Sequence, residues 1–132
     1  MVAIQPRLSL QQQEIAADTK TLRSLDWDRS RFDIEFGLRN GTTYNSFLVR
    51  GERTALIDSS HAKFRSSWIP ALQEMVDPKT IDVLIVSHTE PDHSGLIGDL
   101  LELNPEIEVV GSKVAINYLQ SQVHRAFKSR AV

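Results

Sequence analysis

The sequence contains no cysteine. This absence excludes disulfides, thiolate zinc sites and iron–sulfur clusters held by cysteine. No apolar run approaches the ~20 residues that a membrane helix needs, and the N-terminus lacks the apolar core of a signal peptide. The net charge of -2 provides no basic surface for nucleic acid. We therefore expect a cytoplasmic protein that neither spans a membrane nor binds nucleic acid.

Glycine is also scarce, and the six glycines are scattered along the chain. They form no G-x-G-x-x-G pattern, so no stretch offers a phosphate-binding loop for a flavin or a nucleotide. The apolar fraction of 41% over 132 residues suffices for the core of one domain at most. Residues 1–12 are polar and are expected to form a loose lead-in.

Metal-binding side chains concentrate in one hexapeptide, residues 88–93, which reads His-Thr-Glu-Pro-Asp-His. It directly follows the apolar run 81–87, which is typical of a buried strand. The hexapeptide is therefore predicted to lie on a loop at the carboxyl end of a strand, where active sites of layered α/β proteins lie. Two imidazoles and two carboxylates this close together are costly without a cation between them. The candidate metal ligands are His88, Glu90, Asp92 and His93.

A polar loop without a metal is the alternative interpretation of this hexapeptide. In that case Asp92 or Ser94 caps the helix that the apolar spacing of residues 96–101 predicts. Clusters of capping residues are common before helices, whereas this order of metal-binding side chains is not. We therefore favour the metal interpretation.

The rest of the sequence predicts alternating strands and helices. Residues 14–25 indicate one or two short strands, and an irregular segment follows to residue 40. The later elements are a hairpin over 42–50 and 53–58, a helix over 62–76, a strand over 81–86, a helix ending near 104, a strand over 107–110, and a last helix capped by Ser112 and extended through 122–131. Alternation of this kind predicts a layered α/β fold, and the hairpin makes its sheet mixed.

Three local features carry specific expectations. The dipeptide Gly51-Glu52 in the hairpin suits a two-residue type II′ turn. Pro70 should kink or restart the helix over 62–76. The irregular segment is too apolar for a bare loop and is expected to fold back on the core as a lid. Its apolar residues are Trp27, Phe32, Ile34 and Phe36.

The order H-x-E-x-D-H in residues 88–93 resembles the metal motif of flavodiiron proteins, a branch of the metallo-β-lactamase superfamily. Hydrolases of that superfamily usually carry H-x-H-x-D-H and bind zinc. Glu90 is a harder ligand than the imidazole it replaces, which shifts the preference from zinc towards iron or manganese. Segments 41–49 and 54–58 resemble strands of the same proteins. The likeness is closest to the cyanobacterial diflavin type and runs from about residue 13 to the end.

This resemblance implies the αββα sandwich of the metallo-β-lactamase fold, with residues 13–132 corresponding to its N-terminal half. It implies that His88 and Glu90 bind one iron and that Asp92 and His93 bind a second. It also implies that the irregular segment lies close to the metal pocket, which is the alternative to a lid on the core. The matching acid, Asp58, orients a ligand from behind in such proteins, and a helix cap or a turn is the other role open to it. Their remaining metal ligands, their FMN-binding flavodoxin-like domain and their flavin-reductase-like domain have no counterpart in this sequence.

The resemblance further implies a parent oxidoreductase that passes electrons from NAD(P)H through FMN to a non-haem diiron centre. Such a centre reduces oxygen to water or nitric oxide to nitrous oxide. Two alternatives remain open: a non-catalytic fragment that binds metal weakly or assembles with partners, and a zinc hydrolase, which Glu90 disfavours. A homo-oligomer is expected, because half a sandwich exposes an apolar sheet face and an unpaired strand edge.

Overall fold

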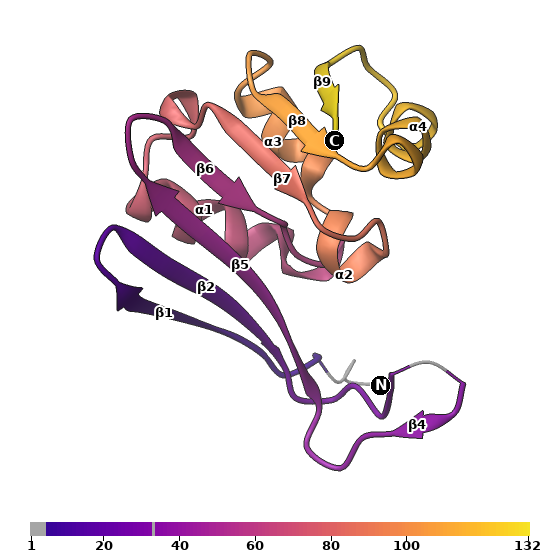
Figure 1. Ribbon diagram of the computed structural model, residues 1–132. Coiled ribbons are helices and arrows are strands. Elements are labelled where there is room, and N and C mark those ends of the chain that lie inside the picture. Colours follow the sequence, from indigo (N-terminus) through magenta and orange to yellow (C-terminus); the bar gives the residue numbers. More distant parts are fainter. Residues whose placement is uncertain (1–4, 33) are drawn as a thin grey trace.

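The structure, a computed structural model, describes residues 5–32 and 34–132. Its centre is a seven-stranded sheet in the order β1-β2-β5-β6-β7-β8-β9 (Figure 1). Pairing is antiparallel from β1 to β6 and parallel from β6 to β9, which confirms the predicted mixed sheet. The strands are β1 (Leu8–Ala16), β2 (Thr19–Asp26), β5 (Thr42–Arg50), β6 (Thr54–Ile57), β7 (Val83–Val86), β8 (Glu108–Gly111) and β9 (Lys128–Ala131).

The described residues also form four α-helices and two short 3-10 helices. Helices α1 and α3 lie behind the sheet in the view of Figure 1. Among the described residues, no helix has the length and apolar character needed to cross a membrane. The bounds are α1 (Arg65–Met75), α2 (Pro91–Ser94), α3 (Ile97–Leu103), α4 (Lys113–Gln122), η1 (Ala62–Phe64) and η2 (Pro78–Thr80).

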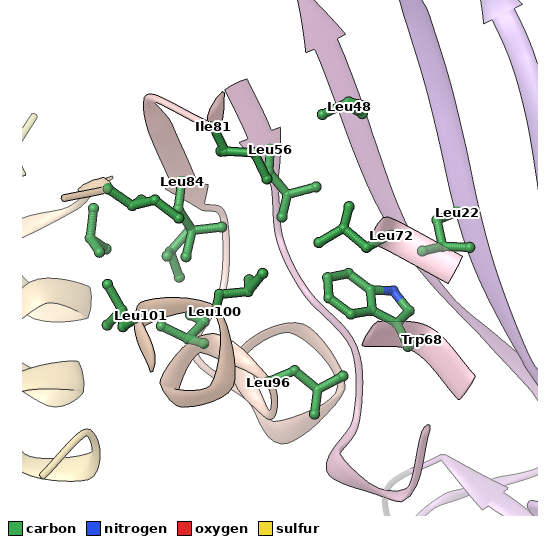
Figure 2. Close-up of a cluster of buried hydrophobic side chains, with 14 of the residues drawn as sticks. Leu22, Leu48, Leu56, Trp68, Leu72, Ile81, Leu84, Leu96, Leu100 and Leu101 are labelled. Atoms are coloured by element: carbon green, nitrogen blue, oxygen red, sulfur yellow. The ribbon is translucent and has the colours of Figure 1, made fainter. Parts of the chain in front are cut away.

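Apolar residues of neighbouring strands form a row across the inner face of the sheet. Leu48 pairs with Leu56, Leu56 with Leu84, and Leu84 with Val109. All of them are buried, and they join side chains of α1 and α3 in one core cluster (Figure 2). Burial of each such side chain contributes about 1.5–3 kcal/mol. Phe64, Trp68, Leu72 and Met75 recur at helical spacing in the predicted helix over 62–76, and all four are buried.

The opposite face of the sheet carries a second apolar row. Phe47 pairs with Ile57, Ile57 with Ile85, and Ile85 with Val110. Successive strand residues point to opposite faces, so this row faces away from the core. Phe47, Ile57 and Ile85 are only partly buried. A sheet with helices packed on one face and an apolar row on the other is one half of an αββα sandwich, as the predicted fold class requires.

The hairpin of β1 and β2 begins earlier than predicted. Two strands are confirmed in the region 14–25, but β1 already begins at Leu8. Only Leu8 and Leu10 alternate with polar residues and pack against the core. The glutamine-rich remainder shows no apolar alternation, and pairing with β2, from Leu8 opposite Asp26 onwards, makes it a strand. Of the lead-in predicted over 1–12, residues 8–12 are therefore strand, and residues 1–4 lie outside the described residues.

The hairpin of β5 and β6 is confirmed, but its loop has three residues. Arg50 pairs with Thr54, which leaves residues 51–53 in the loop. A type II′ turn needs positive φ at its first central residue, and Gly51 does not have it. The predicted two-residue turn is therefore wrong.

Helix α1 runs from Arg65 to Met75 without a break at Pro70. Proline removes the hydrogen bond to the carbonyl four residues back, which is that of Ser66. Both residues are exposed, so water can satisfy this carbonyl. The predicted restart of the helix at Pro70 is therefore wrong.

The chain after α4 is a strand and not the predicted helical extension. β9 runs parallel to β8, with Lys128 opposite Glu108 and Arg130 opposite Val110. The Arg130 guanidinium donates to the Glu108 carboxylate at 3.1 Å, and Lys128 pairs with Glu106. Two cations two residues apart on β9 thus meet one carboxylate on β8 and one in the turn before β8. Residues two apart lie on the same side of a strand but not of a helix.

The irregular segment projects beyond the sheet instead of covering the core. β3 (Arg31–Phe32) pairs with β4 (Phe36–Gly37) in a small hairpin, well away from α1 and α3 (Figure 1). Ile34 is 85% exposed and Phe36 is 65% exposed, so the predicted lid is wrong. Strands β2 and β5 extend past the helices (Figure 1). The segment that joins these two strands is therefore not packed against the helices.

We expect the 132-residue chain to self-associate through the open sheet face. Burial of apolar surface contributes roughly 25 cal/mol per Å², so a few hundred Å² favour association by several kcal/mol before association costs. Light scattering on dilute protein should detect a dimer or a larger species. Ile57→Lys should shift the distribution towards monomer, whereas Val114→Lys, on the exposed face of α4, should not. A stable monomer of the unaltered chain would contradict this expectation.

Gly95, between α2 and α3, packs against two backbone segments. A Cβ there would lie 2.5 Å from the Pro91 carbonyl oxygen and 2.8 Å from the Ser60 carbonyl oxygen. Gly95→Ala should therefore lower the free energy of unfolding by about 1–3 kcal/mol. Gly98→Ala is the matched control in α3, where nothing lies within 4 Å of a Cβ, and it should raise stability by up to about 1 kcal/mol. Chemical denaturation measures both variants, and equal effects would show that crowding at Gly95 is unimportant.

Candidate metal centre

The hexapeptide of candidate ligands follows β7 directly and runs into α2. Pro91 occupies the first turn of α2, where its missing N–H is not needed. His88 and Glu90 therefore lie on the loop, and Asp92 and His93 lie on the helix. The predicted position at the carboxyl end of a buried strand is confirmed.

The four candidate ligands form two neighbouring pairs. His88 Nε2 lies 3.1 Å from Glu90 Oε1, and His93 Nε2 lies 3.6 Å from Asp92 Oδ2. The ring centroids of His88 and His93 are 5.4 Å apart, which brings the pairs side by side. Over residues 5–32 and 34–132, no group of three or more histidine, cysteine, aspartate or glutamate side chains is arranged to hold a metal ion. Each pair by itself therefore offers two donors.

Asp58 lies behind His93 and is buried. His93 Nδ1 lies 2.8 Å from Asp58 Oδ2. The Ser87 amide donates to the other carboxylate oxygen at 2.8 Å, and the Ser87 hydroxyl also donates to Asp58. A carboxylate at Nδ1 favours the tautomer whose Nε2 keeps its lone pair, and Nε2 faces Asp92. The sequence pointed to Asp58, while Ser87 needed the three-dimensional contact to be found.

The backbone at Asp58 has a φ of 58°. This left-handed conformation is uncommon for a residue other than glycine and persists where surrounding contacts hold it. Here the Asp58 amide donates to the Ile85 carbonyl at 2.9 Å, which ties the end of β6 to β7. The carboxylate is thus fixed in a strained turn between two core strands.

A cleft of about 540 Å³ lies beside Asp92 and His93. The ends of β5 and β6 form part of its wall, and α2 forms another part. Phe32 of β3 also lines it, so the irregular segment reaches the candidate site although it does not cover the core. Residues of its wall include Phe32, Tyr44, Asn45, Asp58, Asp92 and His93.

A chain of hydrogen bonds extends from Tyr44 in this wall. Arg29 Nη1 donates to Tyr44 Oη at 2.8 Å, and the Tyr44 hydroxyl donates to Asp26 Oδ2 at 2.7 Å. The Lys63 ammonium donates to the same oxygen. The Arg29 guanidinium lies 4.9 Å from the ring centre of Phe32, a cation–π contact. Sequence reasoning missed this chain, because only the pairing of β2 with β5 brings Asp26 close to Tyr44.

Burial and these partners shift three pKa values. Burial raises the pKa of Tyr44 to about 12, with Asp26 adding to the rise and Arg29 opposing it. Burial also acts to raise the pKa of Asp26, but Lys63 and Tyr44 outweigh it and hold that pKa below the usual 3.8. The hydrogen bond to Tyr44 raises the pKa of Arg29 above its usual value. At neutral pH the tyrosine is therefore protonated, and the aspartate is ionised.

His61 caps η1 at its N-terminus. Its Nδ1 accepts from the Lys63 amide at 3.2 Å, and its ring stacks on that of Tyr44 with centroids 6.1 Å apart. Burial lowers the pKa of His61, and the charges of Lys63 and Arg29 act in the same direction. The ring is therefore a neutral acceptor for the amide it caps.

A larger cleft of about 670 Å³ lies between α2, α3 and α4. The described residues of its wall include Thr89, Pro91, Tyr118 and His124 but none of the four candidate ligands. His124 is exposed. Of the four candidate ligands, Asp92 and His93 line the smaller cleft.

Residues 42–130 match the model of a family described as ODP family beta lactamase. The match begins with β5, reaches β9 and includes the whole hexapeptide. One relative, diflavin flavoprotein A 1 of Synechocystis sp., is 59% identical over 124 residues. That match covers 94% of this chain and 22% of the relative, so the chain spans less than a quarter of the length of this curated protein.

Solved structures of flavodiiron proteins have the same fold. The metal-soaked Flv1 flavodiiron core from Synechocystis sp. aligns with a TM-score of 0.85 at 29% identity, over 96% of this chain and 32% of that one. Rubredoxin oxygen:oxidoreductase from Desulfovibrio gigas aligns with a TM-score of 0.82 at 29% identity, over 92% of this chain and 31% of that one. The resemblance found in the sequence is thus confirmed. Because the family match spans residues 42–130 of 132, the chain belongs to the ODP beta-lactamase family, and its relatives are flavodiiron proteins of the diflavin type.

Proposed function

We propose that this chain provides ligands for a non-haem diiron centre in a flavin-dependent oxidoreductase. The observation that carries the proposal is the arrangement of two donor pairs side by side on one loop. Imidazole and carboxylate donors suit iron and manganese. Two iron ions bound there would supply binding and multi-electron reduction of a diatomic gas.

In this proposal each donor pair holds a separate ion. His88 and Glu90 hold the first, and Asp92 and His93 hold the second. The Asp58 carboxylate accepts the Nδ1–H of His93 and leaves Nε2 free to bind. The side chains of His88 and Glu90 are 52% and 59% exposed, whereas Asp92 is buried. The first pair therefore lies nearer to solvent than the second.

Oxygen, reduced to water, is the proposed substrate of the whole protein, and nitric oxide, reduced to nitrous oxide, is the alternative. Support for oxygen comes from the related structure named rubredoxin oxygen:oxidoreductase. The name diflavin flavoprotein supports a flavin as the carrier, with NAD(P)H as the proposed electron source and FMN as the cofactor. The FMN would be bound in a part of the relatives outside the matched region, since this chain spans 22% of that length.

A second candidate is a metal-binding or assembly unit without catalysis of its own. It is supported by the donor count, because zinc sites use at least three protein ligands per ion and each pair here offers two. The open apolar sheet face supports assembly into a homo-oligomer. In this case the chain binds metal weakly by itself and needs further ligands for a stable centre.

Ferrous ion titrated into the 132-residue chain should bind weakly. His88→Ala should weaken this binding by more than about tenfold, because one of the two donors in a pair is lost. His124→Ala is the matched control, since that exposed histidine lies outside both pairs, and binding should be unchanged. Anaerobic titration calorimetry measures the affinities. Tight binding of two ions would show that this chain contains ligands beyond the two pairs.

The 132-residue chain alone should not consume oxygen steadily with NADH. Its scattered glycines offer no phosphate-binding loop for a flavin, so electrons have no route from the nicotinamide. An oxygen electrode measures the rate, and addition of a purified NADH-oxidising flavoenzyme is the positive control. Sustained consumption without that flavoenzyme would refute the proposal that the flavin binds elsewhere.

A further inference from the structure

We propose that Ser59 is a positioning residue for the candidate metal ligand His93. Its contacts are with the main chain of α2, the helix that carries both Asp92 and His93. The inference rests on the proposed role of His93 as a metal ligand. It adds a residue that fixes the backbone of that ligand, whereas Asp58 fixes the ring.

Ser59 makes two hydrogen bonds to a single carbonyl group. Its amide donates to the His93 carbonyl oxygen at 2.8 Å, and its hydroxyl donates to the same oxygen at 2.7 Å. The Ser59 hydroxyl oxygen in turn accepts from the Leu96 amide at 3.2 Å. The last carbonyls of a helix lack partners within the helix, and α2 has only four residues. One serine therefore satisfies the end of α2 and the approach to α3.

The sheet holds Ser59 from the other side. Its carbonyl oxygen accepts from the Ser46 hydroxyl at 2.7 Å, and the Ser46 carbonyl accepts from the Thr21 hydroxyl at 3.2 Å. Ser46 and Ser59 are both 0% exposed. Buried polar groups keep such bonds because water cannot replace them. A chain of hydrogen bonds thus runs from β2 through β5 to the helix of the candidate ligands.

The left-handed backbone of Asp58 lets two successive residues reach the same target. With φ at 58°, the Asp58 carboxylate meets His93 Nδ1 at 2.8 Å, and Ser59 meets the His93 carbonyl. If only Nδ1 were held, the His93 ring could still move together with the main chain of α2. The second contact removes this freedom and fixes the direction in which Nε2 points.

Ser24 provides a matched comparison within the same core. It is 0% exposed like Ser59, and its hydroxyl lies 2.7 Å from that of Ser60. This bond joins β2 to the segment after β6, and α2 takes no part in it. Loss of the Ser24 hydroxyl should therefore affect stability without releasing His93.

The test uses Co²⁺ as a spectroscopic probe on the 132-residue chain. Ser59→Ala should weaken Co²⁺ binding by about tenfold and change the visible absorption of the bound ion, because His93 is no longer fixed. Ser59→Cys keeps the size but donates more weakly, and it should act in the same direction and decide the test if the alanine variant does not fold. Ser24→Ala should change neither affinity nor spectrum. Unaltered Co²⁺ affinity and spectrum in the folded Ser59 variants would overturn the proposal.

A metal-free measurement separates this proposal from that of the diiron centre. Nuclear magnetic resonance signals of the His93 ring report its tautomer and its order without any ion. Ser59→Ala should shift or broaden these signals, and Ser24→Ala should not. If the unaltered chain binds no Co²⁺, the diiron proposal fails, and the ring signals alone decide the positioning role. His93 signals that are unchanged in the Ser59 variants would overturn it.

Discussion

The hydrogen bond between Asp58 and His93 is the contact on which the geometry of the candidate centre depends. Asp58 stands at the end of β6, whose neighbours are β5 and β7, so its carboxylate is anchored in the middle of the sheet. At 2.8 Å from His93 Nδ1, and with the Ser87 amide on its other oxygen, this carboxylate connects the sheet to both ends of the ligand loop. A carboxylate placed there also fixes the tautomer of the ring. One histidine of the four candidate ligands, His93, is thus tied to the sheet.

This contact needs a backbone that is costly by itself. A left-handed residue other than glycine costs about 1–2 kcal/mol, and Asp58 adopts that conformation. The buried row from Leu48 to Val109 offsets the strain, since each side chain contributes about 1.5–3 kcal/mol. Close approach of Gly95 to the Ser60 carbonyl allows α2 and α3 to pack directly on the segment after β6. The strained backbone of Asp58 and the close packing at Gly95 thus lie in neighbouring segments. Together they hold the loop between β7 and α3 in one geometry.

The two faces of the sheet have different surroundings. The inner face and its helices form the core, while the outer face carries a partly buried apolar row from Phe47 to Val110. The donor pairs lie at the carboxyl end of β7, at the sheet's rim. The wall beside them holds Tyr44, protonated at neutral pH, between Arg29 and the ionised Asp26. In the proposed diiron centre this wall would be a boundary of the cleft held by the hydrogen bonds of Tyr44 to Arg29 and Asp26.

The sequence by itself determined the features whose cause is local. The hexapeptide 88–93, the apolar strand before it, the helical stripe of Phe64 and Trp68, and the family resemblance can all be read from neighbouring residues, because ligand order and apolar spacing are short-range patterns. Only the tertiary structure decided that glutamine-rich β1 is a strand and that Lys128–Ala131 joins β8, since these segments gain their structure from a partner strand far along the chain. The same holds for Ser59 and for the chain from Arg29 to Asp26. A serine or an arginine has no distinctive spacing, and its role depends on which distant groups folding places within hydrogen-bonding distance.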